Sequence, residues 1–175
     1  MKFFSDIRLL LLAIWLGAAV FFIGVAASVF SMIADHEVAG SIVGRNLTIL
    51  NLAGIGISVI MLLTSFVGMR NVNKFLLWTE RFLMLVVGAA CAVGQFVFGI
   101  WLASIKAQMG KPIDEVALDD PLRIQFDVVH HYSEWALFAA MAAALITCFI
   151  ISNRKFGPGK GEKADVYDFS KEFKI

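Results

Sequence analysis

The sequence predicts an all-α membrane protein, an antiparallel bundle of four transmembrane helices. Of its 175 residues, 59% are hydrophobic and 17% are charged, whereas soluble domains average about 45–50% and about 25%. Its mean hydropathy is +0.80. The apolar residues are collected in four long, nearly uncharged runs, and the strands of a membrane barrel would instead show alternation.

Each run is long enough to cross a bilayer. A membrane helix needs about 20 mostly apolar residues to span a hydrocarbon core of roughly 30 Å. Residues 9–33, 47–67, 82–102 and 132–151 meet this length and predict four spans within one domain, residues 1–153. The first run is longer than a signal-peptide core of about 7–15 residues, so we expect an uncleaved helix.

Two further patterns predict details of the bundle. Asp120 followed by Pro121 is typical of a helix start, so we expect the last helix to run from Asp120 to Asn153 and to begin outside the bilayer core. Small residues at four-residue spacing predict close helix contacts, because lipid offers no hydrophobic drive between helices. These pairs are Ala13/Gly17, Gly24/Ser28, Gly54/Ser58 and Gly88/Ala92.

The distribution of Lys and Arg predicts the orientation. With four spans, the N-terminus, the second loop and the C-terminal tail share one side, which holds eleven of these residues against four on the other. Cytoplasmic loops carry the excess of positive charge. We therefore expect both termini to be cytoplasmic, with residues 154–175 as a basic tail next to the lipid bilayer.

Several classes of function are disfavoured. A net charge of +1 argues against nucleic acid as a partner, because such binding leaves a basic stripe. The two cysteines, Cys91 and Cys148, lie in apolar runs without metal-ligand or disulfide spacing and are expected to be buried thiols. The sequence contains no nucleophile–base pair, phosphate loop or zinc signature, so a non-enzymatic protein is the expected class.

Polar residues collect at the outer ends of the predicted spans. Asp127, His130 and Glu134 share one helical face, and we expect His130 to matter more than His131, which flanks that face. By depth, one candidate ligand site converges beneath the outer headgroups: Arg45, Asn51, Gln95, His130 and Glu134. An ionisable residue inside a membrane is a functional candidate by default.

A structural interpretation of the same residues stays open. In it, Arg45, His130 and His131 lie at the membrane interface, and a Glu134–Arg45 pair only fastens the last span to the second. Separately, we expect Glu134 to be buried and paired with Arg45 or with a nearby donor such as Gln95 or His130. On the opposite side of the membrane, Arg8, Glu80 and Arg81 are expected to anchor the helices at the cytoplasmic boundary, by snorkelling or pairing.

A haem or copper site is the alternative hypothesis. Haem requires axial imidazoles from opposed helices, so His36 would have to fold inward. Copper(I) accepts soft thioether ligands. The candidate ligands on the outer side are Met32, His36, Met109, His130 and His131.

The stretch Leu9–Leu62, with Trp15-Leu16-Gly17 and Ala39-Gly40, resembles the transmembrane protein 205-like family, and Phe126–Ser133 is similar to the opening of that family's last helix. The resemblance implies a four-helix membrane protein without a settled activity. Its bacterial members are filed as a domain of unknown function, which implies the bacterial inner membrane. The family is distantly similar to the copper-resistance protein D-like group, whose members include haem-linked proteins.

These observations favour an accessory or transport-linked membrane factor with a polar cluster near the outer face. Transporters usually show repeats and broken helices, and a four-helix chain is small for one. A homo-oligomer or a membrane-protein partner is therefore expected. The alternative is a haem- or copper-binding membrane protein that uses His130 and nearby outer residues.

Overall fold

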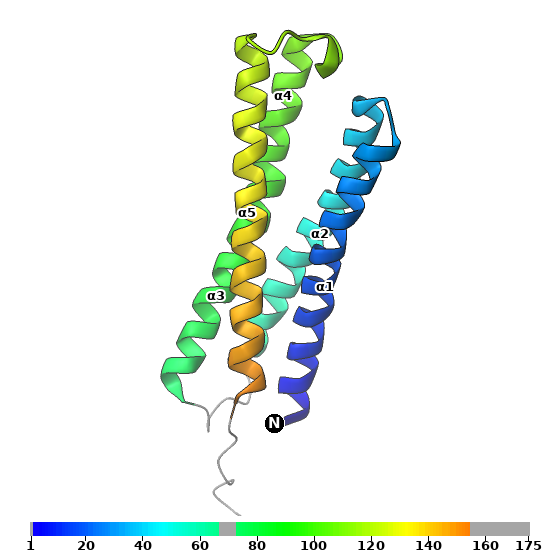
Figure 1. Cartoon of the computed structure of the whole chain (residues 1–175). Helices are drawn as coiled ribbons and strands as arrows, with labels where there is room; N and C mark the ends of the chain where they lie inside the picture. The colour runs from blue at the N-terminus through cyan, green and yellow to red at the C-terminus, as the bar shows by residue number, and fades with distance from the viewer. Residues whose placement is uncertain (1, 67–72, 155–175) are drawn as a thin grey trace, which may run out of the picture.

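The computed structural model describes residues 2–66 and 73–154, and these are almost entirely helical (Figure 1). The helices are α1 (Lys2–Met32), α2 (His36–Thr64), α3 (Lys74–Ala92), the π-helical segment η1 (Val93–Phe98), α4 (Gly99–Met109), the short 3₁₀ helix η2 (Ile113–Glu115) and α5 (Pro121–Ser152). The predicted all-α fold class is confirmed.

Four stretches are long and apolar enough to cross a membrane: residues 3–32, 36–64, 74–109 and 121–152. The third comprises α3, η1 and α4 as one continuous span. The chain is therefore a multi-pass integral membrane protein. Successive spans are joined at alternate ends of the bundle (Figure 1); we call the end that holds the N-terminus the terminal end, and the opposite end the loop end.

Helix starts follow from capping side chains. Asp120 accepts a hydrogen bond from the backbone N–H of Leu122, and Pro121 occupies the first helical position, so the predicted start of α5 is confirmed. Asp35 caps α2 in the same way, accepting from Glu37 N and Val38 N. Such caps satisfy amides that have no partner inside the helix, and they allow α2 and α5 to begin well before their apolar runs.

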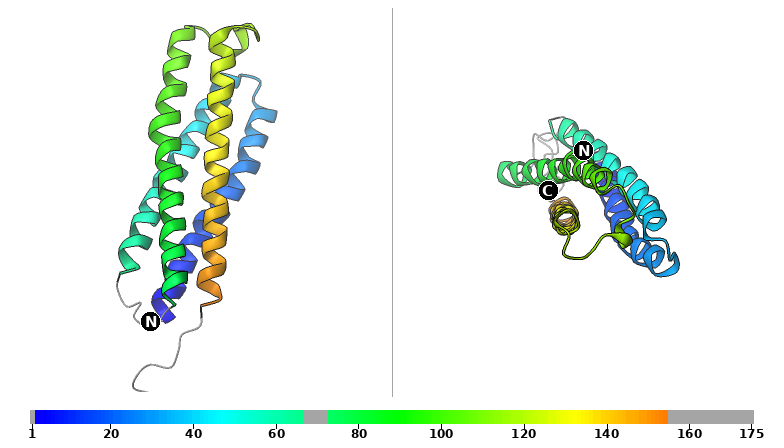
Figure 2. Two further views of the ribbon diagram at one scale, coloured as in Figure 1. Left: turned by 90° about the vertical axis from the view of Figure 1, so that its left-hand side faces the viewer. Right: turned by 90° about the horizontal axis from the view of Figure 1, so that it is seen from above.

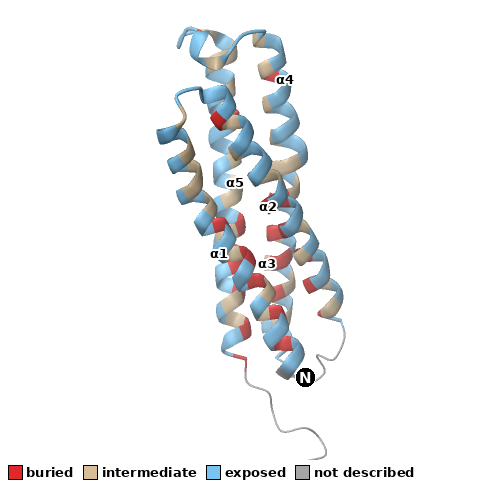
Figure 3. Cartoon of the chain, turned by 90° about the vertical axis from the view of Figure 1, so that its right-hand side faces the viewer, coloured by how far each residue is buried: buried red, intermediate tan, exposed pale blue. Residues whose placement is uncertain are grey.

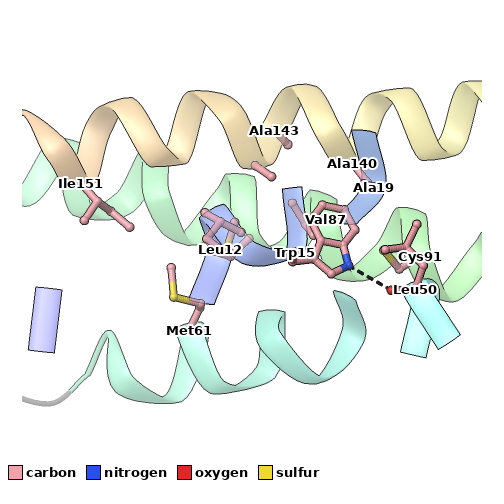
Figure 4. Packing of buried hydrophobic residues seen from close by; sticks show 12 residues of the cluster. Leu12, Trp15, Ala19, Leu50, Met61, Val87, Cys91, Ala140, Ala143 and Ile151 are labelled. Atoms are coloured by element: carbon pink, nitrogen blue, oxygen red, sulfur yellow. Dashed lines mark hydrogen bonds between the residues drawn. The ribbon is translucent and has the colours of Figure 1, made fainter. Parts of the chain in front are cut away.

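The terminal half of the bundle holds one common hydrophobic core. Leu12, Trp15 and Ala19 of α1 pack with residues of α2, α3 and α5, and the buried positions concentrate in this half (Figure 3). Figure 4 shows the centre of the core, where the Trp15 indole Nε1 donates to the backbone oxygen of Leu50 at 3.0 Å. A buried indole N–H needs such a partner.

Small residues permit the closest contacts, although only on some helices. A Cβ on Gly54 would lie 2.6 Å from Cys91 Sγ and 2.9 Å from Trp15 Nε1, and one on Gly88 would lie 3.1 Å from Ser58 Cβ. The pairs on α2 and α3 therefore act as expected. The pairs on α1 do not: Gly17 and Gly24 are exposed with nothing within 4 Å.

The loop half is organised differently. Towards the loop end α1 and α2 form one pair and α4 and α5 another, and the two pairs separate (Figures 1 and 2). Ala39, Ile105, Val116 and Val129 are buried there but lie outside the common core. Contacts between the pairs include the His36 ring with Asp114 at 3.0 Å, and Lys106 Nζ lies next to Gly40, 3.8 Å from the position that a Cβ would take there.

We expect Gly54→Ala to destabilise the protein, because the added methyl group meets Cys91 Sγ and Trp15. Overpacking of a core costs typically about 1–3 kcal/mol. Gly56→Ala is the matched control on the same helix, since nothing lies within 4 Å of Gly56. Thermal unfolding in detergent, followed by circular dichroism, measures both; equal melting temperatures for the two variants would contradict the packing described.

Candidate functional site

The loop half of α5 carries a carboxylate between two imidazoles. His130 Nε2 lies 3.5 Å from Glu134 Oε1, and His131 Nδ1 lies 3.2 Å from Glu134 Oε2. The spacings of four and three residues place all three side chains next to one another on a helix. We call His130, His131 and Glu134 the α5 cluster. Its side chains are about half exposed, at 53%, 68% and 48%.

Hydrogen bonding assigns the tautomer of His131. Trp135 Nε1 donates to His131 Nε2 at 3.1 Å, and because indole is only a donor, that ring nitrogen must be unprotonated. His131 is then neutral and carries its proton on Nδ1, which faces Glu134 Oε2. The carboxylate is therefore the acceptor at the end of a chain that runs from Trp135 through His131.

His130 is held from its other side by an aromatic ring. The ring of Phe126 stacks on His130 with centroids 6.0 Å apart and planes within 6°. Lys106 Nζ of α4 lies 5.6 Å from the centroid of the Phe126 ring. The stacking fixes the plane of the imidazole, so that Nε2 remains directed at Glu134.

The structure brings together only part of the site predicted from the sequence. Glu134 contacts His130, one of its three expected partners, but it is half exposed rather than buried and does not contact Arg45. Arg45 is exposed on α2 and makes no ion pair with any described residue. Asn51 is buried against Gly94, and Gln95 is half-buried in η1. The separation of α2 from α5 in the loop half explains why the five residues do not converge.

His131 also differs from expectation. Helical periodicity places His131 beside the face that His130 and Glu134 share. It still reaches Glu134, because on a helix the side chains three and four residues before a given residue both lie next to it. The structure therefore gives the carboxylate two histidine partners instead of one.

The candidate metal ligands are dispersed. His36 pairs with Asp114 of the loop between α4 and α5, Met32 is exposed on α1, and Met109 is half-buried at the end of α4. Among the described residues, no group of three or more His, Cys, Asp or Glu side chains is arranged to hold a metal ion.

A second polar cluster closes the terminal end. Glu80 of α3 is fully buried and forms ion pairs with Arg8 of α1 and with Arg154, which follows α5. Arg8 Nη2 also donates to the backbone oxygen of Met61 at 2.8 Å. One carboxylate thus joins α1, α3 and the end of α5, while Arg8 reaches α2.

The sequence indicated part of this terminal cluster. Pairing of Arg8 and Glu80 at the boundary is confirmed, whereas Arg154 was assigned to the tail and is instead buried at 7% exposure. Its position directly after the last apolar run was the available signal. Arg81 is separate: it donates to Ser65 Oγ at 2.8 Å and to Ser65 O at 2.9 Å, and its guanidinium lies 4.2 Å from the Phe66 ring centroid.

The comparisons with known proteins give one family. The model of a domain of unknown function (DUF4149) matches residues 10–111, which include most of α1, all of α2 and the third span. No curated protein and no solved structure matches the chain. The resemblances to the transmembrane protein 205-like family and the copper-resistance protein D-like group are not tested by this match.

We expect Glu80→Gln to be strongly destabilising. The change leaves the buried guanidiniums of Arg8 and Arg154 without their shared carboxylate, and removal of one partner from a buried ion pair costs about 3–5 kcal/mol. Asp6→Asn is the control, because Asp6 is an exposed carboxylate on α1 at the same end. If both variants melt at the wild-type temperature, the terminal cluster does not hold the bundle together.

Proposed function

The chain belongs to the DUF4149 family, a family of domains of unknown function, and we propose that it is a non-enzymatic accessory or transport-linked membrane protein whose ligand-binding group is the α5 cluster. The observation that carries the proposal is the location of Glu134 and its contacts with two histidines. Its carboxylate lies on a membrane-spanning helix, half exposed, and is positioned by His130 and His131. Ionisable residues in spans usually mark ligand or ion paths.

The surroundings of the cluster favour a ligand at the membrane interface. Trp135 and Phe138 follow Glu134 by one and four residues and are exposed, with ring centroids 6.4 Å apart, and aromatic residues of this kind sit at the level of the headgroups. An oriented carboxylate beside aromatic faces accepts a cationic or hydrogen-bond-donating group, because the ring faces attract cations as well. A ligand of that chemistry is therefore the class we propose.

The cluster is proposed to face the outside of a bacterial inner membrane. The support is the excess of Lys and Arg on the side of the termini, eleven against four, together with the positive-inside rule. The α5 cluster and the residues between α4 and α5 then lie on the outer side, and both termini are cytoplasmic.

Cysteine labelling in intact cells tests the orientation. In a background with Cys91→Ala and Cys148→Ala, Lys111→Cys should react with a membrane-impermeant maleimide without lysis, because residue 111 lies between α4 and α5. Asp6→Cys, at the terminal end, should react only after the membrane is opened. The reverse pattern would place the termini outside.

Native mass spectrometry of protein purified from its own membranes tests the ligand site. We expect a retained mass in the wild type that Glu134→Gln loses. His130→Ala and His131→Ala should each raise the Kd of the ligand about tenfold, the loss of about one hydrogen bond's net contribution, and so lower the retained mass. Gln125→Ala, exposed on the same helix, is the control.

Elemental analysis and a visible spectrum of the same samples identify metal or haem, which the proposed site does not require. A wild type that retains nothing, or a Glu134→Gln variant that retains the same masses, would assign the α5 cluster to structure alone.

A further inference from the structure

Asn51 is a buried polar side chain in the middle of a membrane span, without a hydrogen-bond partner among the described residues. It lies 15 residues into α2, about 22 Å from the start of that helix, and is 4% exposed. Its amide makes no hydrogen bond with any described residue. A buried amide offers two donors and an acceptor, and leaving them unpaired is unfavourable in a medium without water.

The helix opposite Asn51 is irregular at the same level. η1 forms a π-helical turn in which the backbone N–H of Gly99 donates to Gly94 O. A Cβ on Gly94 would lie 3.3 Å from Asn51 Nδ2, so the glycine leaves room for the amide. π-helical segments of this kind occur frequently at functional sites.

A second carboxamide follows directly in η1. Gln95 is half-buried, and like Asn51 it makes no hydrogen bond within the described part of the chain. Two unpaired carboxamides next to one π-helical turn are not needed for packing, because an apolar residue of the same shape avoids the cost of an unmade bond. Their natural partner is a polar group that comes from outside the chain.

The charge of the surroundings selects the kind of partner. Leu50 and Ala140 lie at one level of the bundle (Figure 4), and Glu134 lies six residues beyond Ala140, about 9 Å closer to the loop end. That carboxylate is already held by two imidazoles. Neither Asn51 nor Gln95 carries charge, and an ion without a counter-charge is strongly disfavoured in the hydrocarbon core. The partner is therefore neutral.

We propose that the Asn51 amide, which packs on Gly94, and Gln95, the next residue of η1, bind the neutral carbonyl or hydroxyl head of a lipid-soluble molecule. This site is separate from the α5 cluster and goes beyond the proposed function, so either one can fail without the other.

Quenching of Trp15 fluorescence tests the site, because Trp15 donates to the backbone oxygen of Leu50, the neighbour of Asn51. The full chain in nanodiscs carries Trp78→Phe, Trp101→Phe and Trp135→Phe, which leaves Trp15 as the reporter. Decyl-ubiquinone is the carbonyl probe, and farnesol, a hydroxyl probe, competes with it. We expect saturable quenching in this background.

Three variants and a control distinguish a role of these residues in probe binding from a role in the stability of the fold. Asn51→Leu and Gln95→Leu should each weaken the saturable quenching at least tenfold, and Gly94→Ala should do so by displacing the Asn51 amide. Asn46→Leu is the control, because the Asn46 amide is exposed on the same helix and donates to Ile42 O at 3.0 Å. Asn51→Leu should also keep or raise the melting temperature, since it removes an unpaired amide.

Several outcomes would overturn the proposal. The first is quenching that never saturates, or that is equal in Asn51→Leu and the reference. The second is a melting temperature of Asn51→Leu well below that of Asn46→Leu, because the amide would then have a structural bond. Saturable quenching by decyl-ubiquinone supports the site in either case: relief by farnesol shows that it also accepts a hydroxyl head, and no relief restricts it to a carbonyl head.

Discussion

The contact between Trp15 and α2 is the constraint on which the terminal half depends. An indole N–H in hydrocarbon requires an acceptor, and it finds one in the backbone oxygen of Leu50. The ring reaches that oxygen only because residue 54 is glycine: a Cβ there would lie 2.9 Å from Nε1 and 2.6 Å from Cys91 Sγ. One small residue therefore sets the distances among α1, α2 and α3, and the core residues fill the space that these distances define.

The terminal cluster stabilises the same half by a different interaction. Glu80 is buried together with Arg8 and Arg154, and taking such charges out of water is costly unless they are paired. Shared pairing with one carboxylate ties three elements that are distant in the sequence. Direct bonds of this kind matter more in a bilayer than in water, because the lipid supplies no hydrophobic drive for helices to associate. In the loop half the described contacts between the helix pairs are fewer, and the pairs separate.

The sequence was sufficient for features that depend on local chemistry. Apolar length identified the four spans, Asp120 and Pro121 located the start of α5, and four-residue spacing placed His130 beside Glu134. Features that depend on contacts between helices were not predictable. In a membrane span both the lipid-facing and the helix-facing sides are apolar, and α1 has small residues on both, so nothing in its sequence distinguished the buried Ala19 from the exposed Gly17. The π-helical turn adds one residue to a run whose one polar side chain is Gln95, and no spacing pattern in the sequence indicates it.

That extra residue explains how the two halves of the bundle differ. A π-helical turn changes the direction in which all later side chains face, relative to a continuous α-helix. Before η1, α3 packs against both α2 and α5; after it, α4 packs mainly on α5. The packing of α2 on the third span thus diminishes beyond Gly94, and at this level Asn51 is buried without a hydrogen bond to any described residue. The change of helix geometry and the unpaired amide therefore lie at the same level of the bundle.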